Sequence, residues 1–533
     1  MVADMRRHLI ILMALAVPLA AALTPLAANA GSPARTATCA AMPVSAPTGT
    51  TVESVRATAN AGGTVTVPAF PPLQPDPVTF TDVPAWCDIT VTVTHPGAND
   101  HVTIKISLPQ DRAQWNGRFQ ATGGSAYLAG DLGATLVAAV RNGYTAGATD
   151  AGVGSNAVDV SGWALTPTGE VDTPLLTNFA SRSLHDLAAV GKEVTKRFYN
   201  EAAHYSYWNG CSTGGRQGYE EAQDYPHDFD GILAKAPAVN WDRFAVATAW
   251  SQAVFNEEKV QPTTCEMDAF TAAAVNACDG DDGVRDGIID NPQDCHWDAR
   301  RLVGTKLDCQ GRQITISRAT ADAVNKIWAG PVSASGHKLW YGPNKGADFA
   351  ALATPGQPFF VAAEWIKYFV TRNPSFDLTK LTYQSFEQLF RSSQRQFNAV
   401  IGTDDPDLSR FARAGGKLLS WHGQADQLVP TQGTVDYRER VNRVFGGNQR
   451  VDDFYRLFLL PGVAHCQGGS GPQVSDDTAL AALIKWVEKG QAPATLAAGT
   501  GTVTRNICRY PMVTRYTGHG DPGSAANYRC VAA

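Results

Sequence analysis

The feature that most limits the possible folds of this 533-residue chain is the alternation of short apolar strands with helices. Apolar residues at helical spacing in residues 183–200 predict one helix, and residues 215–226 predict a second that ends at Pro226. Segments that contain buried strands surround these helices and return later in the chain, within residues 118–124, 143–152, 204–210, 229–238, 415–430 and 453–466. This alternation predicts an α/β fold in which helices cover a parallel sheet.

A break in the alternation predicts a large insertion in the α/β core. Residues 241–400 are rich in Asp, Cys and Trp and lack the strand–helix pattern. Upstream of the alternation, residues 88–96 and 101–109 have the apolar–polar period of half-buried antiparallel strands. We therefore expect a signal peptide at residues 1–30 and the first part of the core at 31–240. An inserted lid at 241–400 and the second part of the core at 401–533 would follow.

The first thirty residues are typical of a secretory signal. Arg6 and Arg7 precede an apolar run that ends in the small residues Ala28-Asn29-Ala30, which resemble a cleavage site. A retained membrane anchor is the alternative, but prolines interrupt the run. We expect a secreted or periplasmic protein with no membrane contact after cleavage. A net charge of −6 and the lack of a later basic run exclude nucleic acid as a partner.

Ten cysteines follow the predicted signal, and an even number in an exported chain indicates up to five disulfides. A zinc site is the competing interpretation, but the sequence contains no CxxC pair. The cysteines are Cys39, Cys87, Cys211, Cys265, Cys278, Cys295, Cys309, Cys466, Cys508 and Cys530.

Ser212 lies in a Gly-x-Ser-x-Gly motif between a predicted strand and a predicted helix. This context is typical of a nucleophile elbow, a tight turn that exposes a serine hydroxyl at the carboxyl edge of the sheet. A plain turn serine is the alternative. The N–H of Thr213 would face a developing oxyanion, and a second donor, Gly124 or Ser125, would come from the glycine-rich residues after the strand near Arg118.

A reactive serine needs a base and an acid that orients the base. In α/β-hydrolases these residues follow the serine in the order acid, then histidine. Asp426 lies in a loop behind one predicted strand, and His465 lies in a glycine-rich loop behind the next. We predict a Ser212, Asp426 and His465 triad. His422 is the main competitor as the base, although it lies within the strand end.

Two cysteines flank the predicted catalytic residues. Cys211 precedes Ser212 and Cys466 follows His465. If the serine and the histidine are in contact, the cysteines are near enough to form a disulfide. The alternatives are that each cysteine pairs elsewhere or stays free.

An aspartate-rich loop between Cys278 and Cys295 predicts a calcium site. It departs from the EF-hand pattern at Gly283, but its donors are all oxygen atoms, which calcium prefers over zinc. A solvated acidic loop is the alternative. The expected ligands are carboxylates and backbone carbonyls, from Asp279, Asp282, Val284, Asp286 and Ile288.

These stretches together resemble the tannase and feruloyl esterase family of α/β-hydrolases, which also contains mono(2-hydroxyethyl) terephthalate hydrolase. The resemblance covers nearly the whole mature chain, and the stretches that carry it are residues 207–241, 281–290, 405–430, 459–469 and 508–530. The resemblance implies a serine esterase with this triad, a Cys211–Cys466 disulfide and structural calcium in the lid.

The implied substrate is a small aromatic or phenolic acid ester, cleaved through an acyl-enzyme. A noncatalytic calcium-dependent binding protein, or a peptidase or acyltransferase with the same triad, are the alternative functions.

Overall fold

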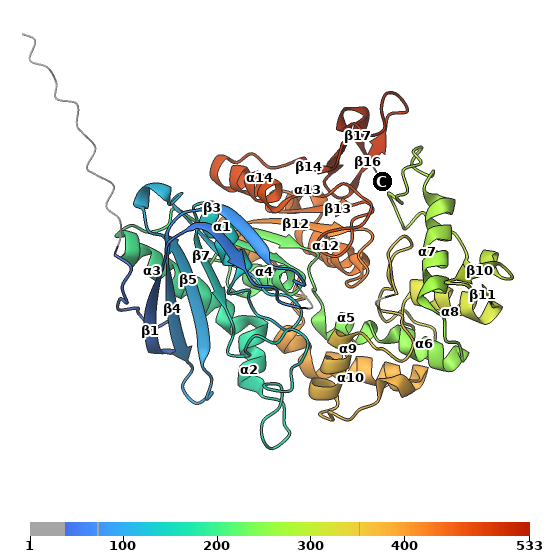
Figure 1. Cartoon of the computed structure of the whole chain (residues 1–533), viewed down its shortest axis with the longest axis horizontal. Coiled ribbons are helices and arrows are strands. Elements are labelled where there is room, and N and C mark those ends of the chain that lie inside the picture. Colours follow the sequence, from blue (N-terminus) through green and yellow to red (C-terminus); the bar gives the residue numbers. More distant parts are fainter. Residues whose placement is uncertain (1–37, 72–73, 351, 533) are drawn as a thin grey trace, which may run out of the picture. The chain divides into compact units, whose positions relative to one another are not determined.

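A mixed sheet forms the centre of the protein. The computed structural model describes residues 38–71, 74–350 and 352–532, so the predicted signal peptide lies outside the described residues. Within them, nine strands pair in the order β1-β4-β5-β7-β6-β8-β9-β12-β13 (Figure 1). In that order the strands are Thr51–Asn60, Trp86–Thr94, Val102–Pro109, Thr145–Thr149, Arg118–Thr122, Tyr205–Cys211, Gly231–Lys235, Lys417–Gly423 and Tyr455–Leu460.

The pairing divides this sheet into two parts. Neighbours from β1 to β7 are antiparallel. Neighbours from β7 to β13 are parallel, so the carboxyl ends of β6, β8, β9, β12 and β13 share one edge. The predicted α/β fold is confirmed, and the loops that follow β8, β12 and β13 all begin at this edge.

Helices cover both faces of the sheet, because successive side chains of a strand point to opposite faces. Trp208 of β8 packs in the core beneath one group of helices, and Tyr207 packs in the core beneath the other. The first group contains α3 (Ser183–Tyr199), α4 (Thr213–Asp224), α11 (Ser409–Ala414), α12 (Thr431–Phe445) and α13 (Asn448–Val451). The second contains α1 (Ala134–Arg141) and α14 (Asp476–Lys489).

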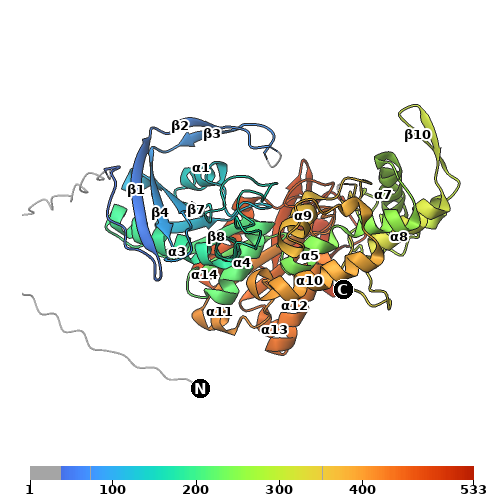
Figure 2. The ribbon, with the colours of Figure 1, turned by 90° about the horizontal axis from the view of Figure 1, so that it is seen from below.

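An antiparallel pair, β2 (Gly63–Val67) and β3 (Val78–Val83), forms an arm that lies over α1 (Figure 2). Val65, Val67 and Phe80 of this arm pack against the core beneath α1. The guanidinium of Arg141 lies 5.8 Å from the centre of the Phe80 ring. The arm is therefore attached to α1 by packing rather than by extension of the large sheet.

Residues 241–401 form a largely helical segment with an aromatic core. Trp241 and Trp365 are fully buried there, and the core also takes in Tyr127 and Phe179 from earlier in the chain. The Tyr127 hydroxyl donates to the carbonyl of Val361 at 2.7 Å. Because residues from outside 241–401 contribute to this core, the packing does not mark where a lid begins and ends, and the predicted lid boundaries stay a prediction. The segment contains α5 (Trp241–Ala247), α6 (Trp250–Glu258), α7 (Thr264–Cys278), α8 (Arg318–Ala329), α9 (Phe360–Glu364), α10 (Tyr383–Ile401), β10 (Lys306–Cys309) and β11 (Arg312–Thr315).

The remaining elements are short. Two hairpins, β14–β15 and β16–β17, follow α14, and they are Thr495–Thr500, Val503–Cys508, Met512–Tyr516 and Tyr528–Ala532. The short helices are η1 (Arg112–Gln114), α2 (Thr173–Thr177), η2 (Asn178–Arg182), η3 (Ala299–Leu302), η4 (Trp365–Val370), η5 (Leu378–Lys380) and η6 (Ala525–Asn527).

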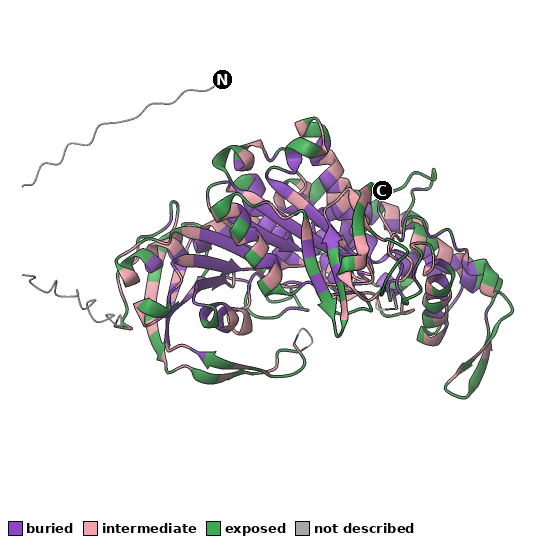
Figure 3. Cartoon of the chain, turned by 90° about the horizontal axis from the view of Figure 1, so that it is seen from above, coloured by how far each residue is buried: buried purple, intermediate pink, exposed green. Residues whose placement is uncertain are grey.

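Five disulfides use all ten cysteines, as the even count predicted. They are Cys39–Cys87, Cys211–Cys466, Cys265–Cys309, Cys278–Cys295 and Cys508–Cys530. Figure 3 shows that the buried residues concentrate in the central sheet and the helices next to it. Among the described residues, no helix is both long enough and apolar enough to cross a membrane.

One close contact between α3 and the sheet gives a test of this packing. A Cβ atom on Gly191 would lie 2.2 Å from the ring of Phe119, which is fully buried. We expect Gly191→Val to lower the free energy of unfolding by about 3 kcal/mol, because the ring has no space to move into. Gly162→Val is the control, since nothing lies within 4 Å of its Cβ position. Urea unfolding curves that show equal losses for the two variants would contradict this packing.

Candidate functional site

Ser212 occupies a strained turn between β8 and α4. Its backbone has φ 62° and ψ −120°, a conformation that side-chain-bearing residues seldom adopt. A Cβ atom on Gly210 would lie 2.4 Å from the carbonyl oxygen of Gly214, so the strand and the helix approach closely only because Gly210 has no side chain. A Cβ atom on Gly214 would lie 3.0 Å from the carbonyl oxygen of Gly124, in the loop after β6. The turn thus has the backbone geometry expected of a nucleophile elbow.

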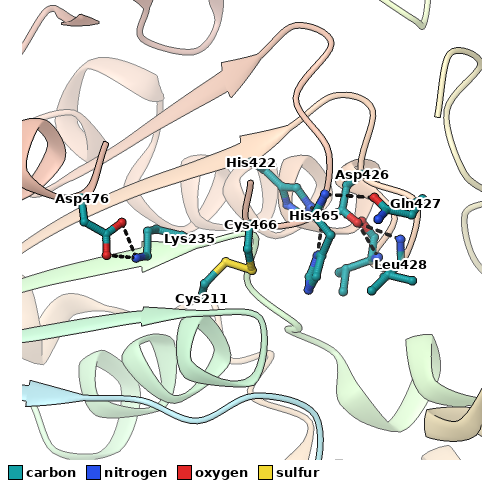
Figure 4. The surroundings of a disulfide bond; sticks show 10 residues. Cys211, Lys235, His422, Asp426, Gln427, Leu428, His465, Cys466 and Asp476 are labelled. Carbon is teal, nitrogen blue, oxygen red and sulfur yellow. Dashed lines mark hydrogen bonds and ion pairs between the residues drawn. A yellow bond between two sulfur atoms is a disulfide. The ribbon is translucent and has the colours of Figure 1, made fainter. Parts of the chain in front are cut away.

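Asp426 and His465 meet at the same edge of the sheet. Asp426 follows β12, His465 follows β13, and the Asp426 Oδ2 atom lies 2.7 Å from His465 Nδ1 (Figure 4). Asp426 is buried, whereas 11% of the His465 side chain is exposed. This arrangement leaves His465 Nε2 without a partner among the described residues, so that it can accept a proton from another group.

A disulfide connects the serine turn to the histidine loop. Cys211 and Cys466 are joined with their Cα atoms 6.0 Å apart (Figure 4). Ser212 and His465 are therefore each one residue from the same covalent link. The Ser212 hydroxyl makes no hydrogen bond within the described part of the chain, so its contact with the imidazole stays a prediction.

His422 binds the opposite side of the same carboxylate. Its Nε2 atom lies 2.9 Å from Asp426 Oδ2 and 3.1 Å from the Val429 carbonyl, and its Nδ1 lies 2.8 Å from Thr434 Oγ1. Because Nε2 faces two acceptors, it carries the proton. His422 is completely buried, so it is a positioning residue for Asp426 rather than a competing base. In the sequence, this role is indicated only by the position of His422 four residues before Asp426.

Four donors surround the Asp426 carboxylate. Besides the two imidazoles, the N–H groups of Leu428 and Val429 each donate to Oδ1 at 2.8 Å. Burial alone would favour the neutral acid, but the charge and hydrogen bonds of His465 and His422 outweigh it and hold the pKa of Asp426 well below its usual range. The carboxylate is therefore charged at any pH near neutrality.

The glycine-rich loop after β6 corrects one prediction. The N–H of Gly124 donates to Gln217 Oε1 at 3.0 Å, and its carbonyl accepts from the Gly214 N–H at 3.0 Å. Gly124 is thus occupied in holding the loop against α4 and is not free to bind an oxyanion. The N–H groups of Thr213 and Ser125 have no acceptor among the described residues, and Thr213 begins α4, where N–H groups lack helical partners.

The predicted calcium loop folds around Asp279. Its Oδ1 atom accepts from the N–H groups of Asp286, Gly287 and Ile288, at 2.9, 2.8 and 3.2 Å. Asp286 also pairs with Arg505 at 2.9 Å. The Cys278–Cys295 disulfide closes the loop at its two ends.

Negative charge accumulates in this loop. Burial and the neighbouring carboxylates of Asp282 and Asp279 raise the pKa of Asp286, although Arg505 opposes the shift. Burial and Asp282 raise the pKa of Asp290 well above its usual value, and sequence reasoning had not singled out that residue. Within the described residues, no three His, Cys, Asp or Glu side chains converge as a metal centre would require.

Comparisons with known proteins agree on one family. The model of the "Tannase and feruloyl esterase" family matches residues 87–365 and 338–531. A probable feruloyl esterase from Arthroderma benhamiae is 44% identical over 482 residues, which cover 88% of this chain and 89% of that protein. A probable feruloyl esterase B-2 from Neosartorya fischeri is 33% identical, with coverages of 81% and 84%.

Two solved structures share the fold. Tannin acyl hydrolase from Aspergillus niger is 26% identical with a TM-score of 0.80, over 91% of this chain and 92% of that chain. Feruloyl esterase B from Aspergillus oryzae is 28% identical with a TM-score of 0.77, over 91% and 97%. The core sheet described above is therefore that of an α/β-hydrolase.

The lowered pKa of Asp426 predicts a pH dependence of stability. A carboxylate whose pKa falls on folding stabilises the protein above its unfolded pKa, near 4, and that contribution is lost as the pH decreases below it. We expect Asp426→Asn to be less stable at pH 7 and to lose less stability than wild type between pH 5 and pH 3. Urea unfolding at several pH values measures both, with Asp453→Asn, at an exposed position, as the control. Parallel acid profiles for wild type and Asp426→Asn would be contrary to expectation.

Proposed function

The chain belongs to the tannase and feruloyl esterase family, and we propose that it is a serine hydrolase acting on esters of aromatic carboxylic acids. Membership of this family makes it a carboxylic ester hydrolase. The aromatic acyl group is supported by the names of the relatives, which are feruloyl esterases and a tannin acyl hydrolase. The observation that carries the serine mechanism is the 2.7 Å contact between Asp426 and His465, fixed beside the Ser212 turn by a disulfide.

In the proposed reaction, Ser212 is the nucleophile. Its Oγ attacks the ester carbonyl while His465 Nε2 takes the hydroxyl proton, and Asp426 stabilises the resulting imidazolium. The proton then passes to the leaving alkoxide, which departs as the alcohol and leaves an acyl-enzyme. Water, deprotonated by His465, attacks the acyl carbon and releases the acid and the serine.

The developing oxyanion needs fixed donors. Thr213 N–H lies at the positive end of α4, and Ser125 N–H faces no acceptor within the described residues. We assign these two groups to the oxyanion hole, in place of the Gly124 N–H. The strained φ of Ser212 supports this, because the same turn that exposes the hydroxyl also fixes the following N–H.

Ser212→Ala tests the mechanism. We expect kcat/KM for methyl ferulate to decrease on the order of 10⁴-fold or more, and labelling by a fluorophosphonate to disappear. Ser375→Ala, at an exposed serine, is the control and should keep both properties. Wild-type turnover by Ser212→Ala would exclude Ser212 as the nucleophile.

The same triad could serve a peptidase or an acyltransferase. The relatives named above are esterases or acyl hydrolases, which favours water as the acceptor and an ester as the substrate. Comparing kcat/KM for an ester and an amide of one aromatic acid distinguishes the peptidase, and added alcohol distinguishes an acyltransferase.

We also propose that the protein works outside the cytoplasm. Five disulfides with no free cysteine among the described residues are typical of an oxidising compartment.

For the aspartate-rich loop we retain a structural calcium ion as a proposal. The oxygen donors of Asp279, Asp282 and Asp286, with the carbonyls of Val284 and Ile288, suit a hard cation. The influence of Asp282 and Asp279 on the pKa of Asp286 supports it. Against it, no three such side chains converge within the described residues, and the Asp286–Arg505 ion pair supplies part of the neutralising charge without a metal. Calcium would rigidify the loop and would take no part in the ester chemistry.

Chelation tests the calcium proposal. We expect about one calcium per chain by elemental analysis, and a melting temperature that falls when a chelator is added and recovers with calcium. Asp282→Asn should lose the metal, whereas Asp268→Asn, exposed on the neighbouring helix α7, should retain it. No bound metal in the wild-type protein and no chelator effect would disprove it.

A further inference from the structure

The loop after β6 lies directly on the first turn of α4. The carbonyl of Gly124 accepts from the Gly214 N–H at 3.0 Å. The Thr213 hydroxyl donates to the carbonyl of Ala126 at 2.6 Å. A Cβ atom on Gly123 would lie 2.4 Å from the Cα atom of Gly214, so no space separates the loop from the helix. The loop that supplies one proposed oxyanion donor is therefore shaped by the helix that supplies the other.

One side chain of α4 holds both ends of this loop. Gln217 is completely buried and lies one helical turn beyond Thr213. Its Oε1 atom accepts from the Gly124 N–H at 3.0 Å, and its Nε2 atom donates to the carbonyl of Ala129 at 2.9 Å. A side-chain amide carries an acceptor and donors on one planar group, so it can bind an N–H and a carbonyl together. A single amide thus fixes the path of the loop from Gly124 to Ala129.

These contacts decide which N–H group of the loop remains available. The sequence left Gly124 and Ser125 as alternative oxyanion donors. Gln217 takes the N–H of Gly124, whereas the N–H of Ser125 has no acceptor among the described residues. The Gly124 carbonyl and the Ser125 N–H belong to one planar peptide group, so the bond from Gly214 to that carbonyl fixes the direction of the free N–H.

A second glutamine of α4 separates this role from ordinary packing. Gln223 is also buried, and its Nε2 atom donates to the Tyr437 hydroxyl at 3.0 Å while its Oε1 atom accepts from the Asp405 N–H at 3.3 Å. Tyr437 lies on α12, and Asp405 lies between α10 and α11. Each amide therefore makes two hydrogen bonds from the same helix, but only those of Gln217 reach the loop beside Ser212.

We propose that Gln217 is a positioning residue for the oxyanion hole. Its amide holds the loop after β6 in the shape that presents the N–H of Ser125 together with that of Thr213. The Thr213 hydroxyl assists by binding the same loop at Ala126. The inference rests on the proposed serine mechanism, in which Gln217 acts through the loop and touches neither the substrate nor the reacting atoms.

Gln217→Met tests the amide, because methionine has a similar length and cannot replace either hydrogen bond. We expect kcat for methyl ferulate to fall about 10²-fold, the effect of losing one oxyanion donor, with little change in KM. Gln223→Met is the matched control, and its kcat should stay within about twofold of wild type. Urea unfolding of both variants measures the stability that each loses with its two hydrogen bonds.

A thiono ester gives a measurement that a loss of stability does not change. It carries sulfur in place of the carbonyl oxygen, and sulfur is larger and accepts hydrogen bonds weakly, so donors placed for oxygen stabilise it less. The ratio of kcat/KM for methyl ferulate to kcat/KM for its thiono analogue therefore reports on the oxyanion hole. We expect this ratio to fall about tenfold in Gln217→Met and to keep its wild-type value in Gln223→Met.

Thr213→Val is the second variant, for use if Gln217→Met does not fold. Valine is close to threonine in shape and leaves the backbone N–H in place, but it cannot donate to the Ala126 carbonyl. We expect kcat and the ratio to fall in the same direction as in Gln217→Met, by a smaller factor because the Gln217 amide still holds the loop.

Equal losses of kcat in Gln217→Met and Gln223→Met would overturn the positioning role, as would wild-type ratios in both Gln217→Met and Thr213→Val. An inactive Ser212→Ala protein would in that case still support the triad. Wild-type hydrolysis by Ser212→Ala would instead refute the proposed function, and this inference with it.

Discussion

The Cys211–Cys466 disulfide is the constraint on which the site depends. In the sheet β8 and β13 are separated by β9 and β12, so their ends are about 14 Å apart at the usual spacing of strands. The loop after β13 crosses back over the end of β12, where Val463 O accepts from the Ala425 N–H at 2.9 Å. The disulfide then joins Cys211, at the end of β8, to Cys466, in the loop after β13, with their Cα atoms 6.0 Å apart. The serine turn and the histidine loop, which follow strands that do not pair with each other, are thereby linked covalently.

Asp426 supplies the electrostatic counterpart of this covalent constraint. A buried carboxylate is costly unless its oxygens are fully hydrogen-bonded, and here two backbone N–H groups and two imidazoles satisfy them. His422 shares Oδ2 with His465, so it limits the movement of the carboxylate and fixes the direction from which His465 binds. The orientation of the His465 imidazole thus depends on a second imidazole, that of His422, which is completely buried.

The sequence alone predicted those site residues that a short stretch of neighbouring residues identifies. Ser212, Asp426 and His465 each follow a strand, and glycines mark the turns, so pattern alone placed them at one sheet edge. Gly124 was wrong as an oxyanion donor because its N–H is taken by Gln217, and nothing near either residue in the sequence indicates that contact. The limits of the lid stay a prediction, since Tyr127 and Phe179, far upstream, complete the aromatic core of that segment.

A polar side chain in the middle of a sheet face that helices cover is unfavourable for folding, so the stability of the fold does not explain its presence there. β6 directs Phe119 and Ala121 into a well-packed core, yet directs Gln120 to the opposite face, where its oxygen has no partner among the described residues. An apolar side chain there would stabilise the fold, because an unsatisfied buried acceptor costs about 1–3 kcal/mol. The packing of the core therefore does not explain why an amide, rather than an apolar side chain, occupies this position.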